Sequence, residues 1–277
     1  MREVSYYPGC SLHGTAREYD ESFRGVAKLL DIGLHELEGW TCCGASSAHS
    51  LDEELARALA GRNLALARRA GRELLVPCVA CYSRFKTTAT QEQEEASMPE
   101  GALAISYALD YFCREEFRKE ITGKLVKSLA GLKVVCYYGC LGVRPPKLTG
   151  VKQYEHPVHM DRLLGGLGCE MIPWSYKTDC CGAGLMMTRT DVVQKLVGRL
   201  AAMAREADAD VIVTGCPLCQ ANLDTRQDGS EEAIGRAIPV LYFTELLGLA
   251  LGHQEVKKWL GRHIIDPAPV LSYRGLL

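Results

Sequence analysis

The stretch GWTCCGASSAHS, residues 39–50, places Cys42 and Cys43 side by side and follows them directly with Gly44. Adjacent cysteines make a poor disulfide pair, because the bond needs Cα atoms about 4.4–6.8 Å apart, whereas neighbours across a trans peptide lie about 3.8 Å apart. The same triplet returns in KTDCCGAGLMM, residues 177–187. We therefore expect a module that the chain uses twice.

The cysteine spacing repeats beyond the doublet. Each half contains a single cysteine, then the doublet, then a C-x-x-C pair that follows the doublet after 34 residues. The doublet and the pair of the second half are shifted by 138 positions from those of the first. Eight extra residues separate the single cysteine from the doublet in the second half, and we assign them to the Pro-rich loop 144–157. The first set is Cys10, Cys42, Cys43, Cys78 and Cys81, and the second is Cys140, Cys180, Cys181, Cys216 and Cys219.

Two other stretches follow the same repeat and divide the chain. SYYPGC (5–10) corresponds to VCYYGC (135–140), and LAISYALDYFC (103–113) corresponds to PVLYFTELLGL (239–249). A chain of 277 residues is long enough for two domains that each bury a core. We predict two homologous domains, 1–127 and 128–277, related by a pseudo-twofold axis.

The apolar pattern within each half alternates between strand and helix. Short apolar runs predict buried strands at VSYYP (4–8), LLVP (74–77), KVVCYYG (133–139) and DVIVTG (210–215), and apolar residues at three- and four-residue spacing predict helices over 15–33, 51–71 and 191–207. This alternation favours an α/β fold with a small, mostly parallel sheet flanked by helices in each domain. The cysteines follow the carboxyl ends of these strands, which is the edge where open α/β sheets bind ligands.

Charge, apolar runs and cysteine content limit the kinds of partner, location and chemistry that we expect for this chain. The net charge of −2, with Lys and Arg scattered along the chain, predicts no nucleic-acid partner. The start MREVSYYPGC lacks the pattern of a secretory signal, and no apolar run reaches the roughly 18 residues of a membrane span, so we expect a cytoplasmic protein without a direct membrane span. Thirteen cysteines in a reducing compartment indicate metal or redox chemistry. We predict no nucleotide site, because no G-x-G-x-x-G follows a strand and no P-loop is present.

Three interpretations of the thiols compete. Zinc takes four ligands, so a fifth cysteine and an adjacent doublet would be surplus. A thioredoxin-like dithiol would use the C-x-x-C pair alone and leave the other cysteines unexplained. Iron–sulfur clusters suit many thiolates, although an ordinary cubane takes four cysteines, so an unusual cluster in each half fits the pattern better.

The two patterns YYPGC…TCCGASSAHS…PCVACYSR and YYGC…DCCGAG…GCPLC resemble the two cysteine-rich CCG domains in the B subunits of heterodisulfide reductases. The resemblance implies a catalytic subunit that reduces a small disulfide to two thiols, or catalyses the reverse, between two facing non-cubane [4Fe–4S] clusters. It implies that the two cysteine sets are the cluster ligands, and that the partners are a flavoprotein and a ferredoxin-like protein, the A and C subunits of the complex. Related CCG proteins are subunits of thiol:fumarate reductases, some succinate:quinone reductases and sulfur-oxidation versions of the complex, so a non-catalytic role in electron relay or assembly is the alternative.

Residues outside the two sets are weaker candidates. Basic side chains and a histidine near the cysteines could bind the anionic ends of a disulfide substrate. They are Arg84, Arg144, Lys147, His159 and Lys177. Three cysteines have no counterpart in the other half, and we expect them to serve packing. They are Cys113, Cys136 and Cys169.

Overall fold

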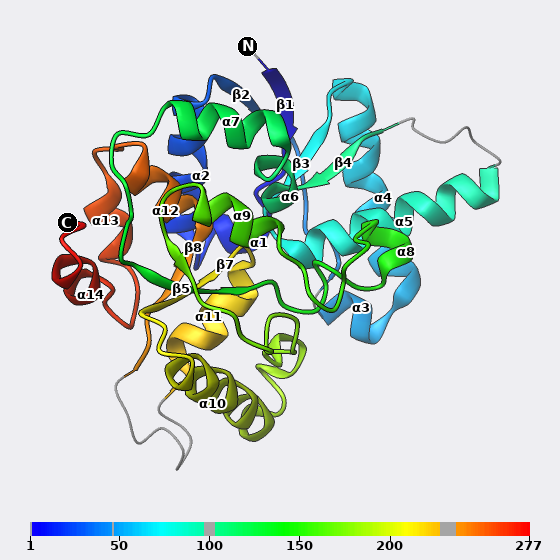
Figure 1. Ribbon diagram of the computed structural model, residues 1–277. Coiled ribbons are helices and arrows are strands. Elements are labelled where there is room, and N and C mark those ends of the chain that lie inside the picture. Colours follow the sequence, from blue (N-terminus) through cyan, green and yellow to red (C-terminus); the bar gives the residue numbers. More distant parts are fainter. Residues whose placement is uncertain (1, 46, 97–102, 228–236) are drawn as a thin grey trace.

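The computed structural model describes residues 2–45, 47–96, 103–227 and 237–277 (Figure 1). The first sheet consists of β1 (Arg2–Tyr6), β2 (Ile32–Glu36), β3 (Leu74–Val76) and β4 (Ile105–Tyr107), and the second of β5 (Lys133–Tyr137), β6 (Glu170–Met171), β7 (Val211–Thr214) and β8 (Val240–Tyr242). The strand orders are β2-β1-β3-β4 and β6-β5-β7-β8, and all these neighbours pair in parallel. The shared order confirms the prediction of a duplicated α/β architecture.

Helices flank both sheets. Those of the first half are α1 (Gly9–His13), α2 (Arg17–Leu29), α3 (Ser47–Leu51), α4 (Glu53–Ala70), α5 (Val79–Ala96), α6 (Ala108–Phe112) and α7 (Glu115–Gly123). Those that follow β5 are α8 (Pro146–Thr149), α9 (His159–Gly165), the 3₁₀ turn η1 (Ala183–Leu185), α10 (Thr190–Glu206), α11 (Pro217–Thr225), α12 (Phe243–Ala250), α13 (Val256–Leu260) and α14 (Ala268–Tyr273). Figure 1 shows α4 and α5 on one side of the molecule, α10 at its lower edge, and α13 and α14 on the opposite side.

The long helices form where the sequence pattern predicts them. Asp52 caps the N-terminus of α4 by accepting a hydrogen bond from the Leu55 amide, and Gly71 closes the helix in the left-handed conformation. In α2 the buried residues recur at helical spacing, which presents one face to the core. They are Glu18, Tyr19, Ser22, Phe23, Val26 and Ala27.

The sequence-based prediction missed the edge strands β2 and β6. The helix predicted over 15–33 ends at Leu29, and the chain then enters β2. Of the β2 residues only Ile32 is buried, while His35 is exposed. A strand at the edge of a sheet with so little buried apolar surface lacks the continuous apolar run that marks β3 and β7. Its counterpart β6 is even shorter, with two residues.

The two halves share one hydrophobic core. Phe23 of α2 packs against Phe112 of α6 with ring centroids 5.4 Å apart, and Phe112 packs against Phe243 of α12 at 5.9 Å. These three rings are fully buried and connect the two halves directly. The predicted boundary between residues 127 and 128 falls in segment 124–132, between α7 and β5, and it remains a prediction.

Two of the contacts between the halves are equivalent to each other, as a pseudo-twofold arrangement predicts. Helix α2 of the first half packs on α12 of the second, and α9 of the second half packs on α6 of the first. The ion pair between His159 and Asp110, 3.1 Å apart, joins α9 to α6. Ser22 and Thr244 share a buried hydrogen bond of 2.7 Å between α2 and α12.

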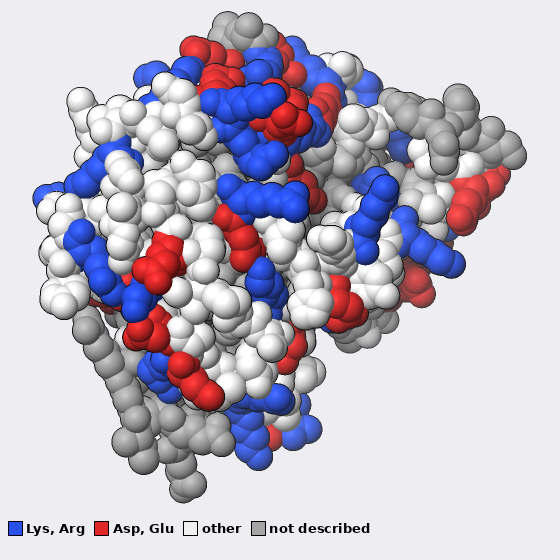
Figure 2. Space-filling model, viewed as in Figure 1, with Lys and Arg blue, Asp and Glu red and all other residues white. Residues whose placement is uncertain are grey.

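Two surface properties of the fold bear on function. Figure 2 shows positive and negative side chains interspersed over the face in view. Within the described residues, none of the helices combines the length and the apolar character needed to span a bilayer.

Candidate metal centres

Each cysteine set gathers at the carboxyl edge of its sheet, as the sequence analysis predicted. Cys10 lies in α1, directly after β1, and Cys78 lies between β3 and the first residue of α5. In the second half, Cys140 follows β5 and Cys216 lies between β7 and α11. Pro217 occupies the first position of α11, where its missing N–H is not needed. The doublets lie in the loops after the edge strands β2 and β6.

The first doublet loop is held by a tyrosine and an asparagine. The Tyr7 hydroxyl donates to the Thr41 carbonyl at 2.7 Å. Asn63 of α4 accepts from the Thr41 amide at 2.9 Å, and its side-chain amide donates to the carbonyls of Thr41 and Cys42 at 3.1 and 3.3 Å. These bonds satisfy the backbone of a loop that leaves the sheet, so the doublet keeps one position.

The second doublet loop is held by the equivalent tyrosine, Tyr137, and by an asparagine from a different helix, Asn222. The Tyr137 hydroxyl donates to the Asp179 carbonyl at 2.6 Å, which repeats the bond of Tyr7 in the first half. Asn222 of α11 donates to the Cys181 carbonyl at 3.2 Å. Asn63 and Asn222 come from non-equivalent helices, so the sequence repeat held no signal for either.

Glycines leave room beside the thiols. Gly9 and Gly139 have φ of 71° and 67°, and a Cβ there would lie 3.4 Å from the Cys81 sulfur and 3.1 Å from the Cys219 sulfur. Gly44 and Gly182 follow the doublets with φ of 78° and 81°. Their amides donate to Cys42 Sγ at 3.4 Å and Cys180 Sγ at 3.3 Å.

Thiols within each set lie close enough to hydrogen-bond to one another. Cys181 Sγ lies 3.5 Å from Cys219 Sγ. Hydrogen bonding from Cys81 lowers the pKa of Cys43 to about 7, and hydrogen bonding from Cys140 lowers the pKa of Cys180 to about 6. In the described ranges, no three Cys, His, Asp or Glu side chains are arranged so that they could hold one metal ion. In each half three thiols are instead linked by hydrogen bonds, Cys43 and Cys78 to Cys81, and Cys181 and Cys216 to Cys219.

The donor set fits an iron–sulfur cluster. Thiolates are the ligands that such clusters take, and amide N–H groups that point at sulfur stabilise its negative charge. Mutual hydrogen bonding lowers the pKa of Cys43 and Cys180 and raises that of their partners Cys81 and Cys140. The glycines permit the close approach of a group larger than a single ion.

Each set has a buried side and a solvent side. The doublet's second cysteine and both members of the C-x-x-C pair are buried in each half. Cys10 and Cys180 are exposed, and Cys42 and Cys140 are half-buried. A small molecule that approaches from solvent therefore meets the single cysteine and the first member of the doublet in both halves.

The two sets lie across the interface from each other. Helix α1, which carries Cys10, contacts α11, which carries Cys219. In the turn after Cys140, a Cβ on Gly142 would lie 3.4 Å from the Val79 side chain, which follows Cys78. Each half thus packs its single-cysteine loop against the C-x-x-C helix of the other half.

The weaker candidates occupy different environments. Arg84 lies one turn after Cys81 on α5, and Lys147 is exposed on α8. Arg144 pairs with Glu155 at 2.7 Å. His159 is held by Asp110 of α6. Lys177 is buried and donates to Asp161 at 2.6 Å and to the Pro157 carbonyl at 3.1 Å, so its ammonium group already has two partners. A substrate role for these five residues remains a prediction.

The three unmatched cysteines lie in the packed interior. Cys136 in β5 is fully buried, Cys169 is buried, and Cys113 packs against the core. Burial raises the pKa of all three thiols, which keeps them protonated and suits a packing role.

A buried charged pair lies behind the second C-x-x-C helix. His263 Nε2 lies 2.9 Å from Glu245 of α12, and both side chains are fully inaccessible. Its Nδ1 lies 3.0 Å from the side-chain amide of Gln220, the residue after Cys219. Burial alone lowers the pKa of His263, but the Glu245 carboxylate raises it to about 9.

This pair predicts a loss of stability at alkaline pH. Because the folded-state pKa of His263 lies above its unfolded value of 6.5, its contribution is full below about pH 6.5 and is lost as the pH rises through about 9. We expect wild type to lose up to about 3 kcal/mol of unfolding free energy relative to His263→Gln between pH 6 and pH 10. Thermal unfolding of both proteins at several pH values tests this, and parallel curves would contradict it.

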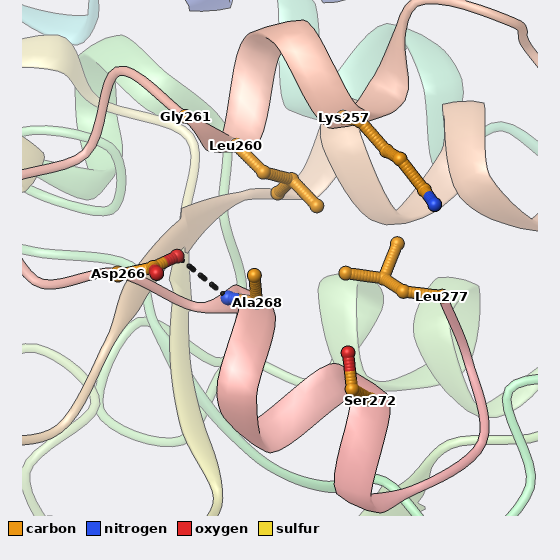
Figure 3. Close-up of a pocket in the computed structure, with 7 residues that line it drawn as sticks. All are labelled: Lys257, Leu260, Gly261, Asp266, Ala268, Ser272 and Leu277. Atoms are coloured by element: carbon orange, nitrogen blue, oxygen red, sulfur yellow. Dashed lines mark hydrogen bonds between the residues drawn. The ribbon is translucent and has the colours of Figure 1, made fainter.

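A pocket with a volume of about 320 Å³ lies between α13, α14 and Leu277, and Figure 3 shows the residues that line it. Lys257, Asp266 and Ser272 contribute its polar side chains. None of its lining residues is a cysteine, so this pocket is separate from both thiol sets.

The fold and the paired thiol sets define a duplicated, cysteine-rich α/β protein. The family model described as "CCG: Cysteine-rich domain" matches residues 4–86 and 134–224, once in each half. The chain belongs to this family.

Three curated relatives align with nearly the whole chain. The 8-methylmenaquinol:fumarate reductase membrane anchor subunit of Wolinella succinogenes is 29% identical over 96% of this chain and 98% of its own. The B subunit of the ferredoxin/F420H2-dependent CoB-CoM heterodisulfide reductase of Methanosarcina acetivorans is 27% identical, with 91% of this chain and 90% of its own covered. The B subunit of the ferredoxin:CoB-CoM heterodisulfide reductase of Methanosarcina mazei is 28% identical with the same coverage.

A crystal structure of a hypothetical protein from Helicobacter pylori has the same fold, with a TM-score of 0.75 at 10% sequence identity. The alignment covers 96% of this chain, which spans about half, 52%, of the length of that protein.

Proposed function

We propose that the chain is an iron–sulfur redox subunit that reduces a small disulfide to two thiols, or catalyses the reverse, in a heterodisulfide-reductase-like complex. The observation that carries the proposal is the presence of two complete five-cysteine sets that lie across the interface from each other. The relatives named as B subunits of heterodisulfide reductases, which align over about nine-tenths of the chain, support this class of reaction.

Each set would hold one non-cubane [4Fe–4S] cluster. The ligands are Cys10, Cys42, Cys43, Cys78 and Cys81 in the first half and Cys140, Cys180, Cys181, Cys216 and Cys219 in the second. When bound, the two clusters supply the two electrons that, with two protons, convert one disulfide into two thiols. Duplication of the domain then matches the number of electrons.

The chain's own residues would exclude water and bind and orient the disulfide substrate. The buried cysteines and the tyrosines Tyr7 and Tyr137 keep water from the inner side of each set. The disulfide approaches from the solvent side, where Cys10 and Cys180 are exposed. The basic residues Arg84 and Lys147, with His159, are the candidates to bind its anionic ends, while Arg144 is already paired with Glu155 and Lys177 with Asp161.

Electrons would arrive from partner proteins of the complex, for which a ferredoxin-like C subunit and a flavoprotein A subunit are the candidates. The relatives are themselves named as subunits, which supports a complex. We place the protein in the cytoplasm.

A second candidate is a subunit that relays electrons or assists assembly without catalysis. It is favoured by the Wolinella succinogenes relative, which is named as the membrane anchor subunit of a fumarate reductase. The two roles differ in whether thiols or disulfides act on the clusters directly.

The test is metal and sulfide analysis of anaerobically purified protein, followed by electron paramagnetic resonance with and without an added thiol under oxidising conditions. We expect about eight irons per chain with a comparable amount of acid-labile sulfide, and a paramagnetic signal that changes with the thiol. About two zinc ions and no sulfide would overturn the proposal. Full iron with a signal indifferent to every thiol and disulfide would favour the relay role.

A further inference from the structure

The residue before each C-x-x-C pair differs between the halves. Pro77 precedes Cys78, whereas Gly215 precedes Cys216 at the equivalent position. Proline locks its own φ near −65°, so the chain enters the first pair with a fixed direction. Glycine has the greatest backbone freedom of any residue, so residue 215 does not fix its own backbone, and the second pair has its proline only inside the pair, at Pro217.

Tyr19 of the first half supplies one constraint on Gly215. Its side chain is fully buried, and its hydroxyl donates to the Gly215 carbonyl at 2.9 Å. Its ring stacks on Tyr242, the last residue of β8, with centroids 4.1 Å apart and an interplanar angle of 2°. This stacking holds the Tyr19 ring in one orientation, in which its hydroxyl points at the Gly215 carbonyl.

Tyr107, the last residue of β4, supplies the second constraint. A Cβ on Gly215 would lie 2.6 Å from the Tyr107 hydroxyl and 3.4 Å from the Leu109 side chain. Both residues belong to the first half, so the first half closes over the backbone that leads into Cys216. The close approach of Tyr107 also explains why this position carries glycine.

One cysteine of each set acts electrostatically on Tyr19. Burial raises the pKa of its hydroxyl well above the ordinary value, and the thiols of Cys216 and Cys78, one from each half, raise it further. Tyr242 is also near Cys216, whose thiol contributes to its raised pKa after burial and the nearby carboxylates.

We propose that Tyr19 is a positioning residue: its hydrogen bond to Gly215, with Tyr107 packed on the other side, fixes the direction of the second C-x-x-C pair. The second metal centre then depends on the Tyr19 hydroxyl of the first half, whereas the backbone that enters the first pair is fixed by Pro77 of its own half. This inference rests on the proposed function for its consequence in metal binding, but its structural part is independent of any metal.

Hydrogen–deuterium exchange of Tyr19→Phe tests the structural part. The variant keeps the stacked ring and removes only the hydroxyl. We expect the amides of Gly215, Cys216 and residues 218–220 to exchange about threefold to tenfold faster, as for the loss of one hydrogen bond, and those of 78–82 to be unchanged. Tyr6→Phe is the matched control, because Tyr6 is also fully buried and donates to Asp20 at 2.7 Å, away from Gly215. Unchanged exchange at 215–220 in Tyr19→Phe would overturn the inference whether or not the protein binds iron.

Iron release to a chelator tests the consequence. With Cys43→Ala as background only the second centre remains, and with Cys181→Ala only the first. We expect Tyr19→Phe to speed release by about threefold to tenfold in the first background and to leave it unchanged in the second. Equal acceleration in both backgrounds would show a general loss of structure and would contradict a positioning role. Absence of iron from wild type would refute the proposed function and leave the exchange result to decide the inference.

Discussion

Replacing Cys43 with alanine is expected to remove the first cluster and leave the second intact. Cys43 is buried, so solvent has little access to replace its thiolate, and hydrogen bonding from Cys81 lowers its pKa. Iron should fall from about eight to about four per chain, with a matching loss of sulfide. Cys181→Ala is the reciprocal experiment, and each variant should retain the paramagnetic signal of the other half.

The matched control is Cys169→Ala, which removes a buried thiol outside both sets. It should keep the full iron content, because burial keeps the Cys169 thiol protonated and the residue packs in the core. Full iron in Cys43→Ala and Cys181→Ala would refute the ligand assignment. Loss of all iron from either variant would show that the two centres do not assemble independently.

The repeat of cysteine spacing was sufficient to predict the duplication, and the alternation of apolar runs with helical patterns predicted the α/β class. The buried strands β3 and β7 were visible as apolar runs that are covered on both faces. The edge strands β2 and β6 were missed because few of their residues are buried, and strand pairing at an edge is decided by the neighbouring strand β1 or β5. The placement of the doublets after these strands could therefore not be predicted.

The site was predictable where chemistry repeats and unpredictable where contacts cross between the halves. Tyr7 and Tyr137 stand at equivalent positions, and they make equivalent bonds to the doublet loops. The bond from Tyr19 to Gly215 joins residues 196 positions apart, and no local pattern encodes such a contact. Lys177 is a residue for which the sequence was misleading. Its position beside a cysteine doublet suggested a contact with substrate, but in the fold it is buried and donates a hydrogen bond to Asp161.

Gly44→Ala is expected to cause a large loss of stability and to empty the first metal centre. Gly44 has a φ of 78°, and a Cβ there would lie 2.8 Å from the backbone oxygen of Ala56 in α4. The left-handed conformation costs an alanine about 1–2 kcal/mol, and a clash with helix backbone adds a comparable amount because a helix is unable to shift locally. Relief of the clash would move the doublet loop away from α4, and with it the Gly44 amide that donates to Cys42.

Gly39→Ala separates the two causes. Gly39 has a φ of 71°, almost the same as that of Gly44, but nothing lies within 4 Å of a Cβ at this position. It should therefore lose only the conformational part, about 1–2 kcal/mol, and keep its iron. Thermal unfolding and iron analysis of both variants measure the difference. If Gly44→Ala matched Gly39→Ala in both measurements, the packing of the doublet loop against α4 would have no part in forming the metal centre.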